Sequence, residues 1–292
     1  MPQSSLSQGP GFGRGLIDTE AQRTDQMKPS IEIRDMEEAD EYFVGTCTHT
    51  AESEEIDTCA ARRLAWLRSM HDRGLRVKVA ALNGERAGFL CAIPIECSPW
   101  GPLGRDLLVI PCLYVLQEGH ELGKALIAAA EEEAKRHGRK GIVTIGYRHD
   151  FWFMPASFFD ANHFVECAQN AWGSCDVNDR AVLLWKVLDR QAKAPVPLNP
   201  NYRFTAIPGK VVVDLFWNTL CQTSDTEAQR VREVAAEFGD LVVLNEYCAD
   251  DRAVLCRYQM PRAIFVNGRE IGWGYEAPRD GLRKAIARAL HG

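Results

Sequence analysis

The stretch LLVIPCLYVLQEGHELGKALIAAAEEE, residues 107–133, decides the fold. Its first ten residues are almost wholly apolar, which is typical of a strand covered on both faces. After a short turn, apolar residues recur three and four apart, which predicts a helix opened by glycines. The free amides and positive dipole end of such a helix favour an anion such as pyrophosphate. A plain strand-to-helix connection that uses Gly123 for packing explains the same pattern, so both interpretations stay open at this point.

The segments around this stretch alternate between strand and helix patterns. Asn83-Gly84 separates two apolar runs and predicts a hairpin turn. On either side of the central stretch we expect the following elements: a strand over 31–36, helices over 39–47 and 57–74, hairpin strands over 77–82 and 87–95, a strand over 141–147, a short helix over 154–164 and a strand over 181–188. This succession predicts an α/β fold with a mixed sheet and flanking helices.

The rest of the chain predicts a tail, a linker and a second α/β domain. Residues 1–28 show no hydrophobic period, and three prolines lie close together after residue 190. Beyond them the patterns predict a strand, a helix, further strands around an Asn267-Gly268 turn and a final helix. We therefore expect the following division: a disordered tail over 1–28, a first domain over 29–190, a linker over 191–202 and a smaller α/β domain over 203–292.

Composition excludes several classes of function. With 34 basic and 40 acidic residues the formal charge is −6, which argues against nucleic acid as a partner. No apolar run is long enough for a membrane span, so we expect no membrane association. The ten cysteines are scattered without a C-x-x-C pair, which favours free thiols in a reducing cytoplasm. Cys47 and His49 have no second closely spaced Cys/His pair after them, so we expect no metal site.

The order of hairpin, central strand, GKAL helix, strand, FF-containing helix and strand resembles the GNAT superfamily of acyl-CoA-dependent N-acyltransferases over residues 30–188. The resemblance implies an N-acetyltransferase with acetyl-CoA as cosubstrate. It also implies that acetyl-CoA contacts backbone groups of Leu113, Tyr114 and Val115 and a pyrophosphate turn formed by Gly119, His120, Glu121, Leu122, Gly123 and Lys124.

The sequence departs from the family pattern at two places. Glu121 stands near the position of a glycine, and the basic first residue of the turn is missing. Phe159 stands where the family often has a tyrosine that protonates the leaving thiolate, so we consider water for that role, with Tyr147 or Tyr114 as further candidates. Glu96, at the end of the expected third strand, is the candidate general base, although a solvated loop carboxylate explains it as well.

A second resemblance concerns FWNTLCQTS, residues 216–224. It is similar to the FW-x-x-x-C-x-x-C corner of thioredoxin-like proteins, with Cys221 at the first cysteine and Ser224 in place of the second. Met260-Pro261 stands where such folds place a cis-proline. The resemblance implies an acidic thiol at Cys221 that forms mixed disulfides but no internal one. A Cys221 that simply packs in a retired redox fold is the alternative.

The two resemblances together look like a YoaP-like acetyltransferase arrangement. We therefore expect a cytoplasmic enzyme that transfers acetyl from acetyl-CoA to the amine of a small or amino-acid-like molecule by direct attack, and we include thiol-containing molecules among the expected substrates. A monothiol module around Cys221 would assist the binding of a substrate or partner. A non-catalytic acyl-CoA or thiol sensor and a monothiol redox protein remain the alternatives, and the sequence predicts no oligomeric state.

Overall fold

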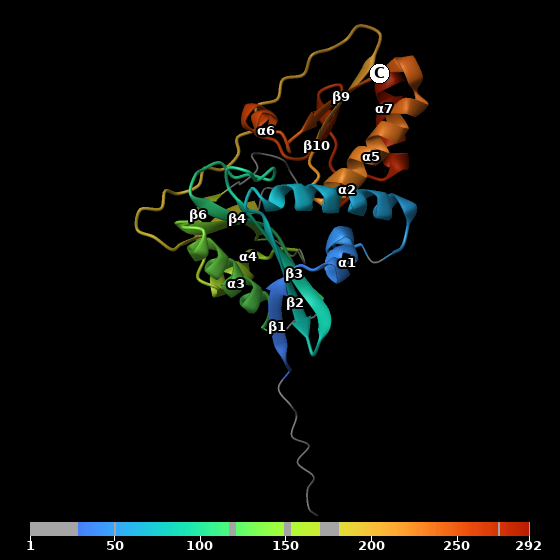
Figure 1. Ribbon diagram of the computed structural model, residues 1–292. Helices are drawn as coiled ribbons and strands as arrows, with labels where there is room; N and C mark the ends of the chain where they lie inside the picture. The colour runs from blue at the N-terminus through green and yellow to red at the C-terminus, as the bar shows by residue number, and fades with distance from the viewer. Residues whose placement is uncertain are drawn as a thin grey trace, which may run out of the picture.

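The computed structural model describes residues 29–49, 51–116, 121–148, 153–169, 181–273 and 275–291. Their elements form two sheets with helices around them (Figure 1). In chain order these elements are β1 (Ile31–Asp35), η1 (Glu38–Asp40), α1 (Glu41–Thr46), α2 (Glu54–His71), β2 (Arg76–Leu82), β3 (Glu85–Pro94), β4 (Leu107–Val115), α3 (Leu122–Arg136), β5 (Gly141–Tyr147), α4 (Ala156–Ala161), β6 (Val165–Gln169), β7 (Ala181–Val187), β8 (Val211–Trp217), α5 (Gln222–Glu237), η2 (Gly239–Leu241), β9 (Val242–Cys248), α6 (Arg252–Tyr258), β10 (Ala263–Val266), β11 (Arg269–Glu270) and α7 (Arg279–His291).

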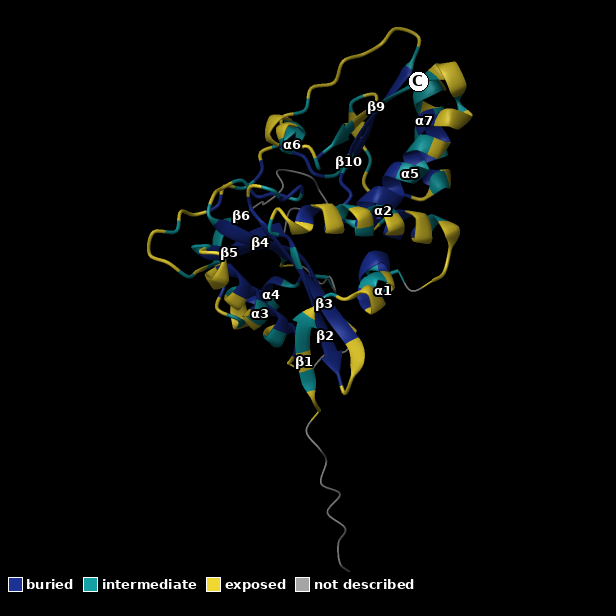
Figure 2. Ribbon diagram, viewed as in Figure 1, coloured by how far each residue is buried: buried dark blue, intermediate teal, exposed yellow. Residues whose placement is uncertain are grey.

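The first sheet has seven strands in the order β1-β2-β3-β4-β5-β7-β6. Its pairs are antiparallel except for β4 and β5, which run parallel. One apolar layer joins one face of the sheet to α1, α2 and the start of the second unit, and another joins the opposite face to α3 and α4. Figure 2 shows the result, with buried central strands and helices exposed on their outer sides. A mixed α/β fold, as expected from the sequence, is confirmed.

The second sheet has four strands in the order β11-β10-β8-β9. β8 and β9 are parallel and flank α5 in the sequence, while β10 lies antiparallel to β8 on its other side. Helices α5 and α7 pack together against one face of this sheet. In Figure 1, α2 lies between the first sheet and this second unit, and it contacts α5 directly. A second, smaller α/β unit is therefore present, as predicted.

Two elements were missed from the sequence. The strand β6 and the helix α6 carry short or mixed patterns, VECAQ and RAVLCRY, which give no clear period. The long helix α2 also begins three residues earlier than expected, because Ser53 caps it by accepting a hydrogen bond from the amide of Ile56 at 3.2 Å. In the ranges that the structure describes, no helix has the length and apolar character needed to cross a membrane.

Candidate functional site

The candidate site lies where the parallel strands β4 and β5 separate. Their ladder runs from Leu107↔Gly141 to Ile110↔Thr144 and stops there, although β4 continues to Val115 and β5 to Tyr147. On its other edge β4 stays paired with β3 as far as Val115. The β4–β5 ladder therefore does not extend along the last residues of β4 in the described part of the sheet.

A bulge and a proline explain why the ladder stops. On β3, Cys91 and Ile93 are two residues apart, whereas their partners on β4, Cys112 and Val109, are three apart, so β4 holds one extra residue. Pro111 lies in this bulge and has no N–H to continue a ladder. The buried hydroxyl of Thr144 donates instead to the carbonyl of Ile110 at 2.8 Å, which closes the ladder at its last pair.

The helix α3 follows the last residues of β4 in the sequence. Glu121 precedes it with φ 57°, a left-handed backbone that glycine adopts at lower cost. The exposed carboxylate of Glu121 does not cap the helix; it pairs with Lys124 at 3.1 Å. A Cβ on Gly123 would lie 2.8 Å from the ring of Phe158, so this glycine is needed for packing against α4. The predicted turn residues Gly119 and His120 lie outside the described residues.

Both candidate proton donors lie beyond the last pair of the β4–β5 ladder. Tyr114 is half-buried on β4 and packs edge-on against Phe89, with ring centroids 6.0 Å apart. Tyr147 is the last residue of β5, and its amide donates to the carbonyl of Met154 at 3.0 Å. Phe159 is fully buried between aromatic rings, so a tyrosine there would bury its hydroxyl in an apolar core. Tyr114 and Tyr147 are therefore less buried than residue 159.

The structure places Glu96 at the opposite end of β4. It follows Pro94, which pairs with Leu108. Tyr114 is six positions further along β4 than Leu108, which corresponds to about 20 Å of extended strand. The carboxylate of Glu96 accepts the amide of Asp106 at 2.7 Å and the guanidinium of Arg139 at 2.9 Å. Glu96 therefore matches the alternative interpretation, a loop carboxylate that holds neighbouring groups in place. Its position does not support a role as general base.

The corner before α5 is held by its own side chains. Cys221 is the N-cap residue, and its amide donates to the side chain of Asn218 at 3.0 Å. Ser224 is buried, and its hydroxyl accepts the amide of Asn218 at 3.1 Å. Ser224 therefore stabilises the corner at the position of the second cysteine in the C-x-x-C pattern.

Two expectations for this corner are wrong. Burial raises the pKa of the Cys221 thiol, and the nearby Arg262 charge and the amide of Ser224 offset this only in part. The expected acidic thiol is therefore not found at Cys221. In the described ranges the cis peptide bond is Gly101–Pro102, not the bond before Pro261.

The charge of Arg262 acts on groups of both units. Its guanidinium donates to Glu227 at 2.7 Å, and its charge acts on both Cys221 and Tyr147. Tyr147 belongs to the first sheet and Cys221 to the second unit, so Arg262 links the two predicted site residues electrostatically. Arg262 was not predicted as a site residue from the sequence, although it directly follows Met260-Pro261.

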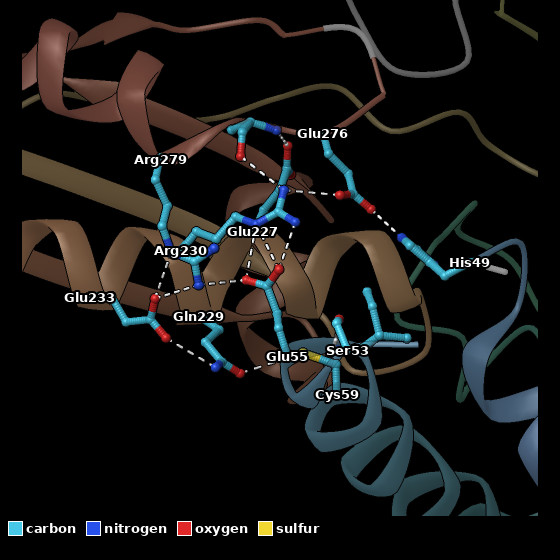
Figure 3. A network of polar contacts seen from close by, with 12 residues as sticks. His49, Ser53, Glu55, Cys59, Glu227, Gln229, Arg230, Glu233, Glu276 and Arg279 are labelled. Atoms are coloured by element: carbon cyan, nitrogen blue, oxygen red, sulfur yellow. Dashed lines mark hydrogen bonds and ion pairs between the residues drawn. The ribbon is translucent and has the colours of Figure 1, made fainter. Parts of the chain in front are cut away.

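An ion-pair network joins the two units beside this corner (Figure 3). Arg230 of α5 binds Glu55 of α2 at 2.7 Å and Glu276 at 2.9 Å. Glu276 also pairs with His49, which precedes α2, and Arg279 binds Glu55 at 2.7 Å. These groups are mostly shielded from solvent, since the side chains of Glu55, Arg230 and Glu276 are only 14–16% exposed. The network therefore fixes α2 against α5.

His49 makes this network sensitive to pH. Its Nε2 faces Glu276 and its Nδ1 faces the carbonyl of Thr46 at 3.1 Å, so both nitrogens face acceptors and the charged ring is favoured. Burial is the largest single effect and lowers the pKa of His49. The bond to Glu276, the charge of Glu276 and the carbonyl of Thr46 together outweigh it and raise the pKa above its ordinary value of 6.5.

Replacing His49 by glutamine should change how stability depends on pH. A raised folded pKa contributes stability that is fully present below pH 6.5 and is lost as pH rises through the folded pKa. We expect His49→Gln to lose that contribution, so its difference from the parent chain should shrink above neutral pH. Urea unfolding at several pH values measures this. His71→Gln, at a side chain that is 64% exposed, is the control, and an equal effect there would contradict the assignment.

Sequence reasoning also missed a buried arginine. Arg63 of α2 is 1% exposed, and its Nε donates to the carbonyl of Leu220 in the second unit at 2.8 Å. Cys47, first considered with His49 as a metal pair, lies nearby at the end of α1. In the part of the chain that the structure describes, no group of three or more Cys, His, Asp or Glu side chains is arranged to hold a metal ion.

Comparisons with known proteins give matches only among solved structures. No protein-family model and no curated protein matches the sequence. A putative acetyltransferase of the GNAT family from Desulfovibrio desulfuricans is 17% identical, with 54% of this chain and 99% of that chain covered and a TM-score of 0.42. The putative acetyltransferase yncA from Salmonella typhimurium, solved with its cofactor acetyl-CoA, is 20% identical over 56% and 96% of the two chains, with a TM-score of 0.41. The paia N-acetyltransferase from Thermoplasma acidophilum, solved with coenzyme A, is 16% identical over 54% and 99%, with a TM-score of 0.38.

Proposed function

We propose that this chain is an acyl-CoA-dependent N-acyltransferase that moves an acetyl group from acetyl-CoA to the amine of a small molecule. The observation that carries this proposal is the early end of the β4–β5 ladder at Ile110↔Thr144. The two strands separate there, shortly before the start of α3, and this arrangement suits an extended amide-containing chain that ends in a pyrophosphate at the helix start. The resemblance of the sequence to the GNAT superfamily supports the same ligand.

The proposed reaction follows from the groups at this edge. Backbone groups of Leu113, Tyr114 and Val115 would bind the pantetheine arm and polarise the thioester carbonyl. The first amides of α3 and the ammonium of Lys124 would hold the pyrophosphate. A neutral amine would then attack the carbonyl directly, and Tyr147 or Tyr114 would protonate the leaving thiolate. No step in this scheme uses Glu96.

The second unit would supply part of the acceptor site. Its β8-α5-β9 corner and the antiparallel β10 support the thioredoxin-like assignment made from the sequence. The charge of Arg262 acts on both Cys221 and Tyr147, so an acceptor with a carboxylate would be attracted to this part of the molecule. We therefore propose an amino-acid-like amine as the substrate class.

The helix start provides a matched test of acetyl-CoA binding. Lys124 and Lys135 lie at opposite ends of α3, and each pairs with a glutamate three residues earlier, Glu121 and Glu132 respectively. We expect Lys124→Glu to weaken acetyl-CoA binding about tenfold or more, because a hydrogen bond to a charged group contributes about 1.5–3 kcal/mol. Lys135→Glu should leave the affinity unchanged.

Thermal unfolding with increasing acetyl-CoA gives the affinities, since a ligand at one hundred times its Kd stabilises the fold by about 2.7 kcal/mol. Transfer of labelled acetyl to a panel of amino acids and amines then tests the reaction. Binding without transfer would indicate an acyl-CoA sensor. If millimolar acetyl-CoA gave no shift, or if both lysine variants behaved alike, the proposed cosubstrate site would be wrong.

A further inference from the structure

A pocket of about 470 Å³ is lined by the end of β1, by η1 and the start of α1, and by the end of α2 and the start of β2. None of its lining residues belongs to β4, α3 or β5. The pocket is therefore separate from the proposed acetyl-CoA site. Its volume lies within the range of about 300–1,000 Å³ that small-molecule sites occupy.

Part of the lining is an apolar floor. Leu67, Leu75 and Val77 line the pocket, and all three are buried members of the apolar layer between α2 and the first sheet. Met36 lines it too and packs against the same layer while it stays partly exposed. An alkyl chain that lies on this floor loses contact with water, so each added CH₂ group should strengthen its binding.

An acidic rim surrounds this floor. Carboxylates from β1, from η1 and the residue before it, from α1 and from the residue after α2 meet at the pocket; they are Asp35, Glu37, Glu38, Glu41 and Asp72. The lining holds two guanidiniums, those of Arg68 and Arg76, so five carboxylates against two cations leave three negative charges when His71 is neutral. Like charges repel one another, so a cation bound here would relieve a repulsion that the folded chain otherwise sustains.

Both guanidiniums of the lining are held by carboxylates of the protein. Arg68 donates to Glu41 through its Nε at 3.0 Å and pairs with the same carboxylate through its Nη2. The Nε of Arg76 lies 3.4 Å from the buried carboxylate of Glu133 on α3. Glu38, in contrast, is exposed on η1. The pocket should therefore attract cations and not anions.

We propose that this pocket binds a linear aliphatic polyamine, with its alkyl chain on the apolar floor and its ammonium groups at the acidic rim. Ammonium groups donate charge-assisted hydrogen bonds to carboxylates, and the CH₂ groups between them match the floor. A metal ion fits less well, because no three or more Cys, His, Asp or Glu side chains among the described residues are arranged to hold one. The polyamine is a second ligand of the chain and not the amine that accepts the acetyl group.

Isothermal titration calorimetry of the full-length protein at low ionic strength tests the proposal. Spermidine should bind more tightly than magnesium chloride. The apolar floor is tested by two diamines of equal charge: 1,6-diaminohexane has three CH₂ groups more than 1,3-diaminopropane and should bind about fivefold more tightly or better. Hydrogen–deuterium exchange should show that spermidine protects residues 35–41 and 67–77.

Two variants should change the affinity for spermidine in opposite directions. Glu38→Gln removes one charge of the rim and should weaken binding about threefold to fivefold, the size expected for one exposed ion pair. Arg68→Met frees Glu41 from its partner and should strengthen binding by a similar factor. Glu54→Gln is the control, because it removes the same charge at the other end of α2, about 25 Å away along the helix. Its affinity should equal that of the parent chain.

Several outcomes would overturn the proposal. They are the absence of spermidine binding, equal affinities for spermidine and magnesium, equal affinities for the two diamines, and equal behaviour of Glu38→Gln and Glu54→Gln. Spermidine that occupied the proposed acceptor site would protect the region of Tyr147 and would bind all three variants alike. That result would refute the polyamine pocket and leave the transferase proposal standing. None of these measurements needs acetyl-CoA, so the two proposals fail independently.

Discussion

Replacement of Arg63 by methionine should lower the free energy of unfolding by about 3–6 kcal/mol, because it removes two buried hydrogen bonds from a charged group and each contributes about 1.5–3 kcal/mol. Methionine is similar in length but donates no hydrogen bond. The carbonyls of Val44 and Leu220 would lose their charged donor, and the Arg63 charge that helps to lower the pKa of Cys47 would be removed. Urea denaturation followed by circular dichroism at constant pH measures the change.

A second arginine of α2 serves as the control. Arg68 is 57% exposed and pairs with Glu41 on the outer side of the helix. Exposed pairs of this kind contribute about 0–1 kcal/mol, so Arg68→Met should cost little. Similar losses for the two variants would mean that Arg63 acts only through helix packing. A Cys47→Ser, Arg63→Met double variant tests whether the loss involves an interaction between Arg63 and the Cys47 side chain. If it does, the effects of the two single substitutions should not add.

The second large effect is expected at Gly88, opposite the end of β4. A Cβ at this position would lie 2.6 Å from the carbonyl oxygen of Tyr114, a backbone atom that cannot rotate away. Gly88→Ala should therefore displace the last residues of β4, lower stability by about 1–3 kcal/mol as overpacking does, and weaken acetyl-CoA binding at least tenfold. The affinity is measured by thermal unfolding with increasing ligand.

Gly104→Ala is the matched control for this prediction. Its new Cβ would meet the flexible end of Ile95 at 2.8 Å, far from the end of β4. We expect a moderate loss of stability and no change in affinity. If Gly88→Ala bound acetyl-CoA as tightly as the control, the end of β4 would not belong to the binding site.

The sequence predicted most of the first sheet because its strands and helices carry strong local periods. The central strand and the helix α3 follow directly from residues 107–133, and the Asn83-Gly84 turn identifies the β2–β3 hairpin. The short elements β6 and α6 were missed, because five to seven residues of mixed polarity do not establish a period.

The site was harder to predict, since its residues meet through strand register and the contact between the two units. Glu96 follows β3 and Tyr114 lies on the neighbouring strand β4, yet the antiparallel register places them at opposite ends of β4. The acidic thiol was expected at Cys221 from a helix-end motif, but the lowered pKa is found at Cys47. Its cause, Arg63, reads in the sequence as one more charged residue of an amphipathic helix, and only the structure reveals its burial.

The position of α2 between the two sheets has a consequence for how the chain unfolds. One side of this helix packs on the first sheet, while Arg62, Arg63 and the carbonyl of Ile56 bond to residues of α5 or of its N-terminal corner. Separation of the two units would expose buried polar groups on both, including the fully buried carboxylate of Asp225. We therefore expect the two units to loosen together when either one melts. A fragment without the second unit would leave the polar groups of α2 that bond to α5 and its corner without their partners.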